Sequence, residues 1–357
     1  MARLKNIAEG AIAGLAPTPV EAYAMNTYFV NDKFMNAMEF KNNATGSSVG
    51  NYVTSYVLYD DEVVGAAFRT IGNEYEADNS KPSVQYVTLR PLGGAFETDR
   101  VTARALKNGG IDVFKEQQLS QKSNHIKNAF AYYFVHGGIA NDGTATQNEF
   151  GGCIEFFAGD FGGNQIGSVL EIAGGLTVDN ALLLEQHFNE TIALMNRQPN
   201  LVLTTRRGEA LAKTLNSYRN MFTGPIEVDN IKYGQVMGIP IATVSDSSFG
   251  PFTGLSDDDL AEILDGESIP FIFLYINEND GIYTAIPMDG KIIDIVDPEM
   301  GDGTLVKTGA VEMLCAPIFY NPKALAVCGV KFVASTGGDD PGNGDDPGNG
   351  NDNGEND

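Results

Sequence analysis

The stretch DVFKEQQLSQKSNHIKNAFAYYFVHGG, residues 112–138, decides how the fold of this chain is interpreted. Asp112 is a suitable helix N-cap, and neither Pro nor Gly follows until Gly137 and Gly138, which form a typical helix stop. Between these limits, apolar and aromatic side chains recur at helical spacing, at Ile126, Ala129, Phe130, Tyr133 and Phe134. With a rise of about 1.5 Å per residue, residues 112–136 predict one uninterrupted helix roughly 35 Å long.

The sequence before this helix predicts an arm and a long hairpin. Residues 1–48 contain two early prolines and a polar, turn-rich patch at 42–48, so we expect an extended arm with one short helix. Residues 52–59 are rich in aromatic and β-branched side chains and predict a strand, as do 63–71 and 84–89. The polar connection 72–82 then predicts a hairpin that projects from the body. Because isolated hairpins are only marginally stable, it needs a neighbour, either its own body or another copy.

The sequence after this helix predicts a mixture of helices and strands, and the fold class is therefore α+β. Residues 137–176 are glycine-rich, and we expect short strands there, including 153–157. Two helices, 178–196 and 206–218, flank a short buried strand at 201–204. The remaining expected elements are a strand and turn at 236–242, a helix capped by Ser256 and entered through Asp257, Asp258 and Asp259, and strands at 270–276, 282–287, 292–296, 308–319 and 325–333.

Composition and charge exclude several classes of protein. The chain has 357 residues, 43% of them apolar, enough for a substantial core. With 23 basic against 47 acidic residues it carries a net charge of −24, which argues against a basic face that coats nucleic acid. The repetitive tail 337–357 has no apolar anchor, so we expect it to be disordered.

Neither secretion nor membrane insertion is indicated. The three cysteines are an odd number at wide spacing, which is not the pattern of a disulfide framework, and the N-terminus lacks the apolar core of a signal peptide. No apolar run approaches the roughly 20 residues of a membrane span. We therefore expect synthesis in the cytoplasm.

The search for catalytic or ligand-binding motifs finds none in its required context. Residues 46–50 match Gly-x-Ser-x-Gly, but a polar arm precedes them and a strand follows, whereas a hydrolase elbow needs a strand before and a helix after. His125 and His136 would lie roughly 16 Å apart along one helix, so they cannot share a metal ion, and His187 is isolated in the sequence.

The composition of two further segments has a structural explanation that requires no ligand. Residues 159–167 are glycine-rich but do not follow the dinucleotide-binding pattern, and we interpret them as a mobile loop. Residues 257–259 are interpreted as a helix start and not as a site for a hard cation. The sequence therefore predicts no catalytic, cofactor-binding or metal-binding residue, no cofactor, and a structural or binding role.

The order of these elements resembles the major capsid proteins of tailed phages, which have the Hong Kong 97-type fold shared with encapsulins. That order is an arm, a projecting hairpin, a long helix, a glycine-marked turn, two helices with a strand between them, and a strand-rich end. The resemblance covers about residues 49–333. Local segments that resemble the family are 134–138 with 141–143 and 150–152, 201–206, the Gly-x-Pro turn at 237–241, and 307–311 with Pro317 and 324–327.

The resemblance implies a domain plan and a function. The implied plan is an N-terminal arm (1–48), an extended hairpin loop (49–98), a peripheral domain with the spine helix (99–175), an axial domain (176–320), a closing strand that returns to the peripheral domain (321–336) and an acidic tail (337–357). The implied function is self-assembly into hexamers and pentamers of an icosahedral shell that encloses double-stranded DNA in the virion. Scaffolding, portal and decoration proteins are candidate partners, the DNA would be enclosed without sequence-specific binding, and no membrane is involved.

The candidate assembly contacts lie at the hairpin tip. They are Asn73, Glu74, Tyr75, Glu76 and Lys81. Some capsids of this family join neighbours through a Lys–Asn isopeptide bond, but we interpret Lys81 as a solvated edge charge. Two alternatives stay open: an encapsulin-like shell, which would contain an enzyme instead of DNA, and an unrelated soluble enzyme or binding module, which would stay monomeric.

Overall fold

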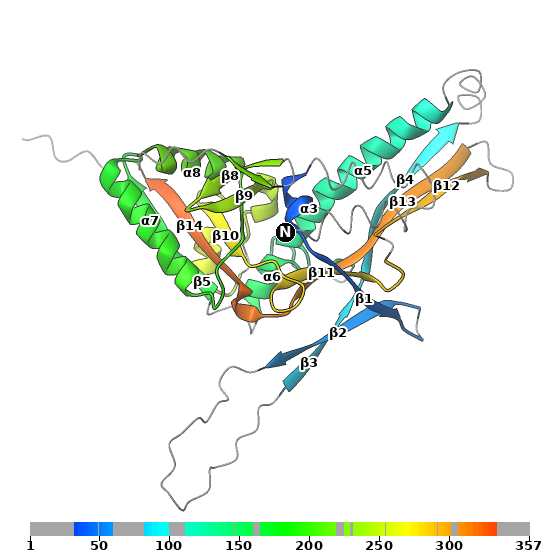
Figure 1. Ribbon diagram of the computed structural model, residues 1–357, viewed down its shortest axis with the longest axis horizontal. Helices are drawn as coiled ribbons and strands as arrows, with labels where there is room; N and C mark the ends of the chain where they lie inside the picture. Colours follow the sequence, from blue (N-terminus) through cyan, green and yellow to red (C-terminus); the bar gives the residue numbers. More distant parts are fainter. Residues whose placement is uncertain are drawn as a thin grey trace, which may run out of the picture.

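A computed structural model describes residues 32–48, 50–59, 82–99, 111–146, 148–159, 165–218, 225–228, 231–253, 255–290, 292–300 and 306–333. These residues form two seven-stranded sheets with helices packed on them (Figure 1). The helices are α3 (Lys33–Ala37), α5 (Ile111–His136), α6 (Cys153–Ala158), α7 (Val178–Ala193), α8 (Arg206–Tyr218) and α9 (Asp258–Ile263), with short 3-10 turns at Asp246–Phe249 and Pro322–Ala324.

The first sheet collects strands from both ends of the chain. Its order is β12-β13-β11-β1-β2-β3, and β4 pairs with β13. The long strand β13 pairs along its first part with β4 and β12 and along its last residues with β11. Its strands are β1 (Phe40–Gly46), β2 (Tyr52–Tyr59), β3 (Pro82–Thr88), β4 (Arg90–Asp99), β11 (Ile282–Pro287), β12 (Ile293–Met300) and β13 (Val306–Phe319).

The predicted long helix is confirmed as α5, which packs on β4 and β13. Its apolar stripe ends in an aromatic cluster, in which the ring centroid of Phe34 lies 5.9 Å from that of Phe130 and 4.9 Å from that of Phe134. Phe34 comes from α3, whose N-cap Asp32 accepts the backbone N–H groups of Phe34 and Met35 at 2.9 Å. The short helix of the arm is thereby fixed to the C-terminal half of α5.

The second sheet is covered by helices on both faces. Its order is β5-β14-β10-β6-β9-β8-β7. Phe271 and Phe273 of β10 pack on Phe188 of α7, with ring centroids 4.8 and 5.7 Å away, while Ile272 and Leu274 belong to the core on the opposite face with Ile263 of α9. Its strands are β5 (Ile166–Ala173), β6 (Leu201–Thr204), β7 (Ile226–Val228), β8 (Ile231–Val236), β9 (Ile239–Thr243), β10 (Ile269–Leu274) and β14 (Leu325–Val333).

Three local expectations are corrected. Residues 153–157 form a helix and not a strand, because Cys153, Ile154 and Phe157 are buried together at helical spacing. The polar patch at 42–48 is strand as far as Gly46, since pairing of β1 with β11 and β2 outweighs its polar composition. The N-cap of α9 is Asp257 and not Ser256, because the Asp257 carboxylate accepts the N–H of Leu260 at 2.9 Å.

Strands β7 and β8 were not expected from the sequence, and neither was the longer strand β4. Pro91, Gly93 and Gly94 argue against a strand, yet β4 is paired with β13 over its whole length. The close approach of the two strands explains Gly93, because a Cβ atom there would lie 2.5 Å from the carbonyl oxygen of Val311. Strands β11 to β13 also join this sheet, so residues 176–320 contribute to both sheets.

Candidate assembly surfaces

The sequence-derived candidates for chemistry are placed in structural roles. No group of three or more His, Cys, Asp or Glu among the described residues could hold a metal ion. His125 is exposed, whereas His136 and His187 are buried in separate places. All three cysteines are buried and unpaired, and burial raises the pKa of the Cys328 thiol to about 12.

The Gly-x-Ser-x-Gly match is a turn between two strands. The N–H of Ser47 donates to the carbonyl of Asn51 at 2.7 Å, and that of Gly50 donates to Ser47 at 3.0 Å. Strand β2 follows directly, so the strand-to-helix geometry of a nucleophile elbow does not occur here. Of the glycine-rich stretch 159–167, residues 160–164 lie outside the described residues, and its last two residues are already the start of strand β5.

None of the described helices has the length and apolar character needed to span a bilayer.

The hairpin stem formed by β2 and β3 has two unlike faces. One face is packed on the body: Thr54 is buried, and the ring centroid of Tyr56 lies 6.2 Å from that of Tyr320. Burial raises the pKa of the Tyr56 hydroxyl to about 12. The other face carries Val84 and Tyr86, which are 50% and 74% exposed. The stem is therefore docked through one face and presents apolar surface to solvent on the other.

The predicted contact residues at the hairpin tip are not among those the structure describes. Asn73, Glu74, Tyr75, Glu76 and Lys81 all lie outside the described residues, as does the strand candidate 63–71. The structure does show the strands on either side, β2 and β3, paired in antiparallel register from Val53 opposite Thr88 to Tyr59 opposite Pro82. In Figure 1 this hairpin and the ribbon of β4, β12 and β13 extend from the body in different directions.

Sequence reasoning missed a second exposed apolar surface, on α7. Val178 and Leu182 are each 60% exposed and Leu183 is 53% exposed. They lie away from the stripe of Ala181 and Leu184 that faces the sheet. The available signal was the unbroken run of three leucines at 182–184, which is wider than one buried stripe requires.

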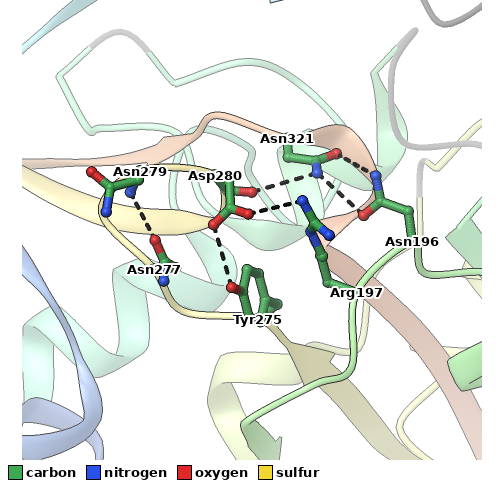
Figure 2. A network of polar contacts seen from close by, with 7 residues as sticks. All are labelled: Asn196, Arg197, Tyr275, Asn277, Asn279, Asp280 and Asn321. Atoms are coloured by element: carbon green, nitrogen blue, oxygen red, sulfur yellow. Dashed lines mark hydrogen bonds and ion pairs between the residues drawn. The ribbon is translucent and has the colours of Figure 1, made fainter.

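A polar junction joins the two sheets where the chain crosses between them (Figure 2). The guanidinium of Arg197 lies 3.1 Å from the carboxylate of Asp280, to which the Tyr275 hydroxyl donates at 3.3 Å. Asn321, at the second crossing, donates to the side chain of Asn196 at 3.2 Å. The junction thus links the loop after α7 to both crossing segments, β10 to β11 and β13 to β14.

Comparison with known proteins identifies the fold. No protein-family model and no curated protein matches this sequence. Among solved structures, the encapsulin complex holo-SrpI of Synechococcus elongatus matches with a TM-score of 0.54 and 9% identity, covering 83% of this chain and 86% of that chain. The mature capsid of bacteriophage PhiM1 matches with a TM-score of 0.51 and 10% identity, covering 84% and 87%.

A third match, to Mycobacterium phage Bobi, has a TM-score of 0.50 and 8% identity and covers 85% of this chain and 90% of that chain. The chain therefore has the Hong Kong 97-type fold of phage capsids and encapsulins, as the resemblance implied. At this level of identity the comparison shows the fold, and the function has to be argued from the surfaces described above.

Proposed function

We propose that this protein is the major capsid protein of a tailed double-stranded DNA phage and that it assembles into hexamers and pentamers of an icosahedral shell. The observation that carries the proposal is the exposed apolar face of the β2–β3 stem, on a fold shared with the PhiM1 capsid. A stem that docks only one face on its own body can bury the other on a second copy. The net charge of −24 suits a container whose wall does not bind the packaged DNA.

The two sheets give this proposal its domain plan. We assign the first sheet with α5 to the peripheral domain and the second sheet with α7 and α8 to the axial domain. Residues 282–319 then belong to the peripheral sheet, because β11 to β13 pair within it. The hairpin is the extended loop, and residues 1–48 and 337–357 are the arm and tail.

The hairpin tip is proposed to contact a neighbouring copy. Asn73, Glu74, Tyr75, Glu76 and Lys81 are the candidate residues, since a polar tip adds little to the core of its own chain. Deletion of residues 73–82 is expected to leave the monomer folded and to impair assembly. A Gly-Ser segment of equal length is the matched control for the length of the loop, and normal shells from the deletion would contradict the assignment.

An encapsulin-like shell is the second candidate. It is kept because the Synechococcus elongatus encapsulin shares the fold, with a TM-score of 0.54, as the PhiM1 capsid does with 0.51. The contents of purified particles separate the two candidates, because a capsid encloses DNA and an encapsulin-like shell encloses protein. Scaffolding, portal and decoration proteins are further proposed partners of a capsid made in the host cytoplasm.

The decisive test is negative-stain electron microscopy of the full chain, expressed alone and then with its phage partners. We expect rings of five or six copies or closed shells. A chain that stays monomeric at high concentration under all these conditions would contradict both shell functions and favour an unrelated enzyme or binding module.

A further inference from the structure

Two arginines lie exposed at the start of α8. Arg206 and Arg207, here called the arginine pair, are its first two residues, and no ion pair among the described residues involves either of them. The backbone of this turn is fixed, because the N–H of Gly208 donates to the Thr205 hydroxyl at 3.3 Å. A guanidinium group binds a carboxylate through two parallel N–H donors. The turn therefore presents two adjacent cationic groups, each of which can bind a carboxylate.

Two lysines of the same part of the chain already have acidic partners. Lys331 of β14 lies 3.0 Å from a carboxylate oxygen of Asp265 and 2.7 Å from one of Glu267. Lys213, further along α8, lies 3.2 Å from the carboxylate of Glu209. An additional carboxylate would have to share these lysines, whereas the arginine pair has no acidic partner among the described residues. An acidic segment that reaches this region should therefore bind at the arginine pair.

The chain leaves the second sheet near the arginine pair. Strands β6 and β14 both run antiparallel to β10, so their C-terminal ends lie at the same edge of the sheet. Thr204 and Cys328 are both paired with Phe271, and Val333 follows Cys328 by five residues, or about 17 Å. The two strands are two strand spacings apart, about 10 Å. The end of β14 therefore lies about 20 Å from Thr204, which precedes the arginine pair by two residues.

The sequence that follows β14 is acidic. Residues 334–357 contain seven acids and no base, and four of the acids form the pairs Asp339–Asp340 and Asp345–Asp346 of a repeated Asp-Asp-Pro-Gly-Asn-Gly segment. A Gly-rich chain of about seven to twelve residues, the length from Val333 to these pairs, has a root-mean-square span of roughly 15–19 Å. This span matches the distance to the arginine pair. Tethering of this kind gives an effective concentration on the order of millimolar.

We propose that the acidic segment 339–346 binds the arginine pair of its own chain. Three observations select this occupant: its charge is opposite, it starts from the same edge of the second sheet, and its length matches the separation. The contact goes beyond the proposed function, because it does not require assembly. Its consequence is that the tail occupies the guanidinium groups to which the phosphates of nucleic acid would otherwise bind.

The chemical reactivity of the arginines measures this contact without altering the binding site. An arginine-specific dicarbonyl reagent with peptide mass spectrometry gives the modification rate of each guanidinium group in the full chain and in a chain that ends at Thr336. At about 20 mM salt we expect the arginine pair to react at least threefold more slowly in the full chain, and at about 1 M salt, where the Debye length is about 3 Å, equally in both. Arg197, which is paired with Asp280 before the other end of β6, should react alike in both chains. Equal rates for the arginine pair in both chains at low salt would overturn the inference.

Two tail variants separate the effect of charge from that of length. The variant D339N/D340N/D345N/D346N keeps the length of the tail but removes its carboxylate pairs, so the arginine pair should react as fast as in the truncated chain. The variant D352N/E355Q/D357N removes the other three acids, and the protection should remain. Protection that survives the first variant, or that is lost in the second, would overturn the assignment to residues 339–346.

A mixing experiment shows whether the tail binds its own chain or a neighbour. Isotope-labelled chains that end at Thr336 are mixed with unlabelled full chains at roughly micromolar concentration, far below the effective concentration of a tethered tail. The labelled arginine pair should stay unprotected, and protection equal to that of the full chain would contradict binding within one chain. These rates are read whether or not the chains assemble, so their failure leaves the proposed shell function standing. A full chain that forms neither rings nor shells would contradict the shell function and not this contact.

Discussion

The two sheets differ in how completely each is buried within one chain. Every residue of β10 in the second sheet is buried, and its two faces contact different helices. In the first sheet, the β2–β3 stem is packed on one face only, and Tyr86 on the other face is 74% exposed. Both faces of β10 are thus covered within one chain, and the core on one of them is shared with the first sheet, whereas one face of the β2–β3 stem is left exposed.

This difference predicts which substitutions act on folding and which act on assembly. Substitutions within the second sheet should lower the free energy of unfolding and lose assembly only as a consequence. Substitutions on the free face of the stem should leave unfolding unchanged and lose assembly directly. Purified monomers and assembled particles therefore have to be measured separately for each variant.

The largest effect is expected for Phe271→Ala in β10. Phe271 is fully buried, and its ring lies 4.8 Å from that of Phe188. Removal of a buried aromatic side chain costs about 3–5 kcal/mol, because transfer energy is lost and a cavity remains. Urea denaturation of the monomer should show this loss. A loss below about 1 kcal/mol would contradict the view that α7 and the second sheet form a closely packed core around Phe271.

Tyr86→Ser should separate assembly from folding. Because Tyr86 is mostly exposed, the free energy of unfolding of the monomer should change by no more than about 0.5 kcal/mol. Shell yield, measured by sedimentation and electron microscopy, should fall strongly. Tyr56→Ser, on the docked face of the same stem, is the comparison, and it should destabilise the monomer as well. Equal shell yields from Tyr86→Ser and the wild type would show that the free face is not an interface.

Near neutral pH, the stability of the chain should depend on pH mainly through His187 of α7, the helix that packs on the second sheet. Burial lowers the pKa of His187 below its usual value of 6.5, and the ring lies 3.2 Å from the carbonyl oxygen of Gly329. The unfolded chain then binds a proton more readily than the folded chain does. Stability should therefore be complete above pH 6.5 and should fall as the pH decreases below it.

Denaturation of the wild type and of His187→Gln across pH 5 to 8 measures this dependence. Between pH 5 and pH 8, the free energy of unfolding of the variant should change much less with pH than that of the wild type. An unchanged slope would place the titrating group elsewhere in the chain.

The sequence predicted those elements whose own residues carry a complete signal. No Pro or Gly interrupts the 26 residues of α5, and its C-terminal half shows the helical period from Ile126 to Phe134, while α8 has a one-sided apolar stripe along its length. Helix α6 was mistaken for a strand because its six residues are too few to show a period. Strand β4 was missed because its conformation is imposed by pairing with β13, against the preference of Pro91 and Gly93.

The exposed surfaces were harder to predict than the elements that carry them. Leu182, Leu183 and Leu184 are chemically alike, and only contact with the sheet shows that Leu184 is buried and the other two are not. Val84 and Tyr86 alternate with inward residues of β3, but which side faces the body depends on the position of Tyr320 in a distant segment. Hydrophobicity in a sequence does not distinguish a core from an interface.

The smallest effect is expected at the polar junction, where the two sheets meet. Arg197 is 54% exposed and Asp280 is 39% exposed, so solvent screens their ion pair. Exposed pairs contribute about 0–1 kcal/mol, and Arg197→Ala should destabilise the monomer by no more than that. The Asp280 carboxylate also accepts the Tyr275 hydroxyl at 3.3 Å, a bond that Arg197→Ala leaves intact. Asp280→Ala should therefore cost more than Arg197→Ala, and denaturation of the two variants with their double mutant measures the coupling. If Arg197→Ala alone removes several kcal/mol, the stability of the chain depends on the junction as much as on the packed second sheet, and the contrast between the buried second sheet and the half-covered stem does not describe where that stability lies.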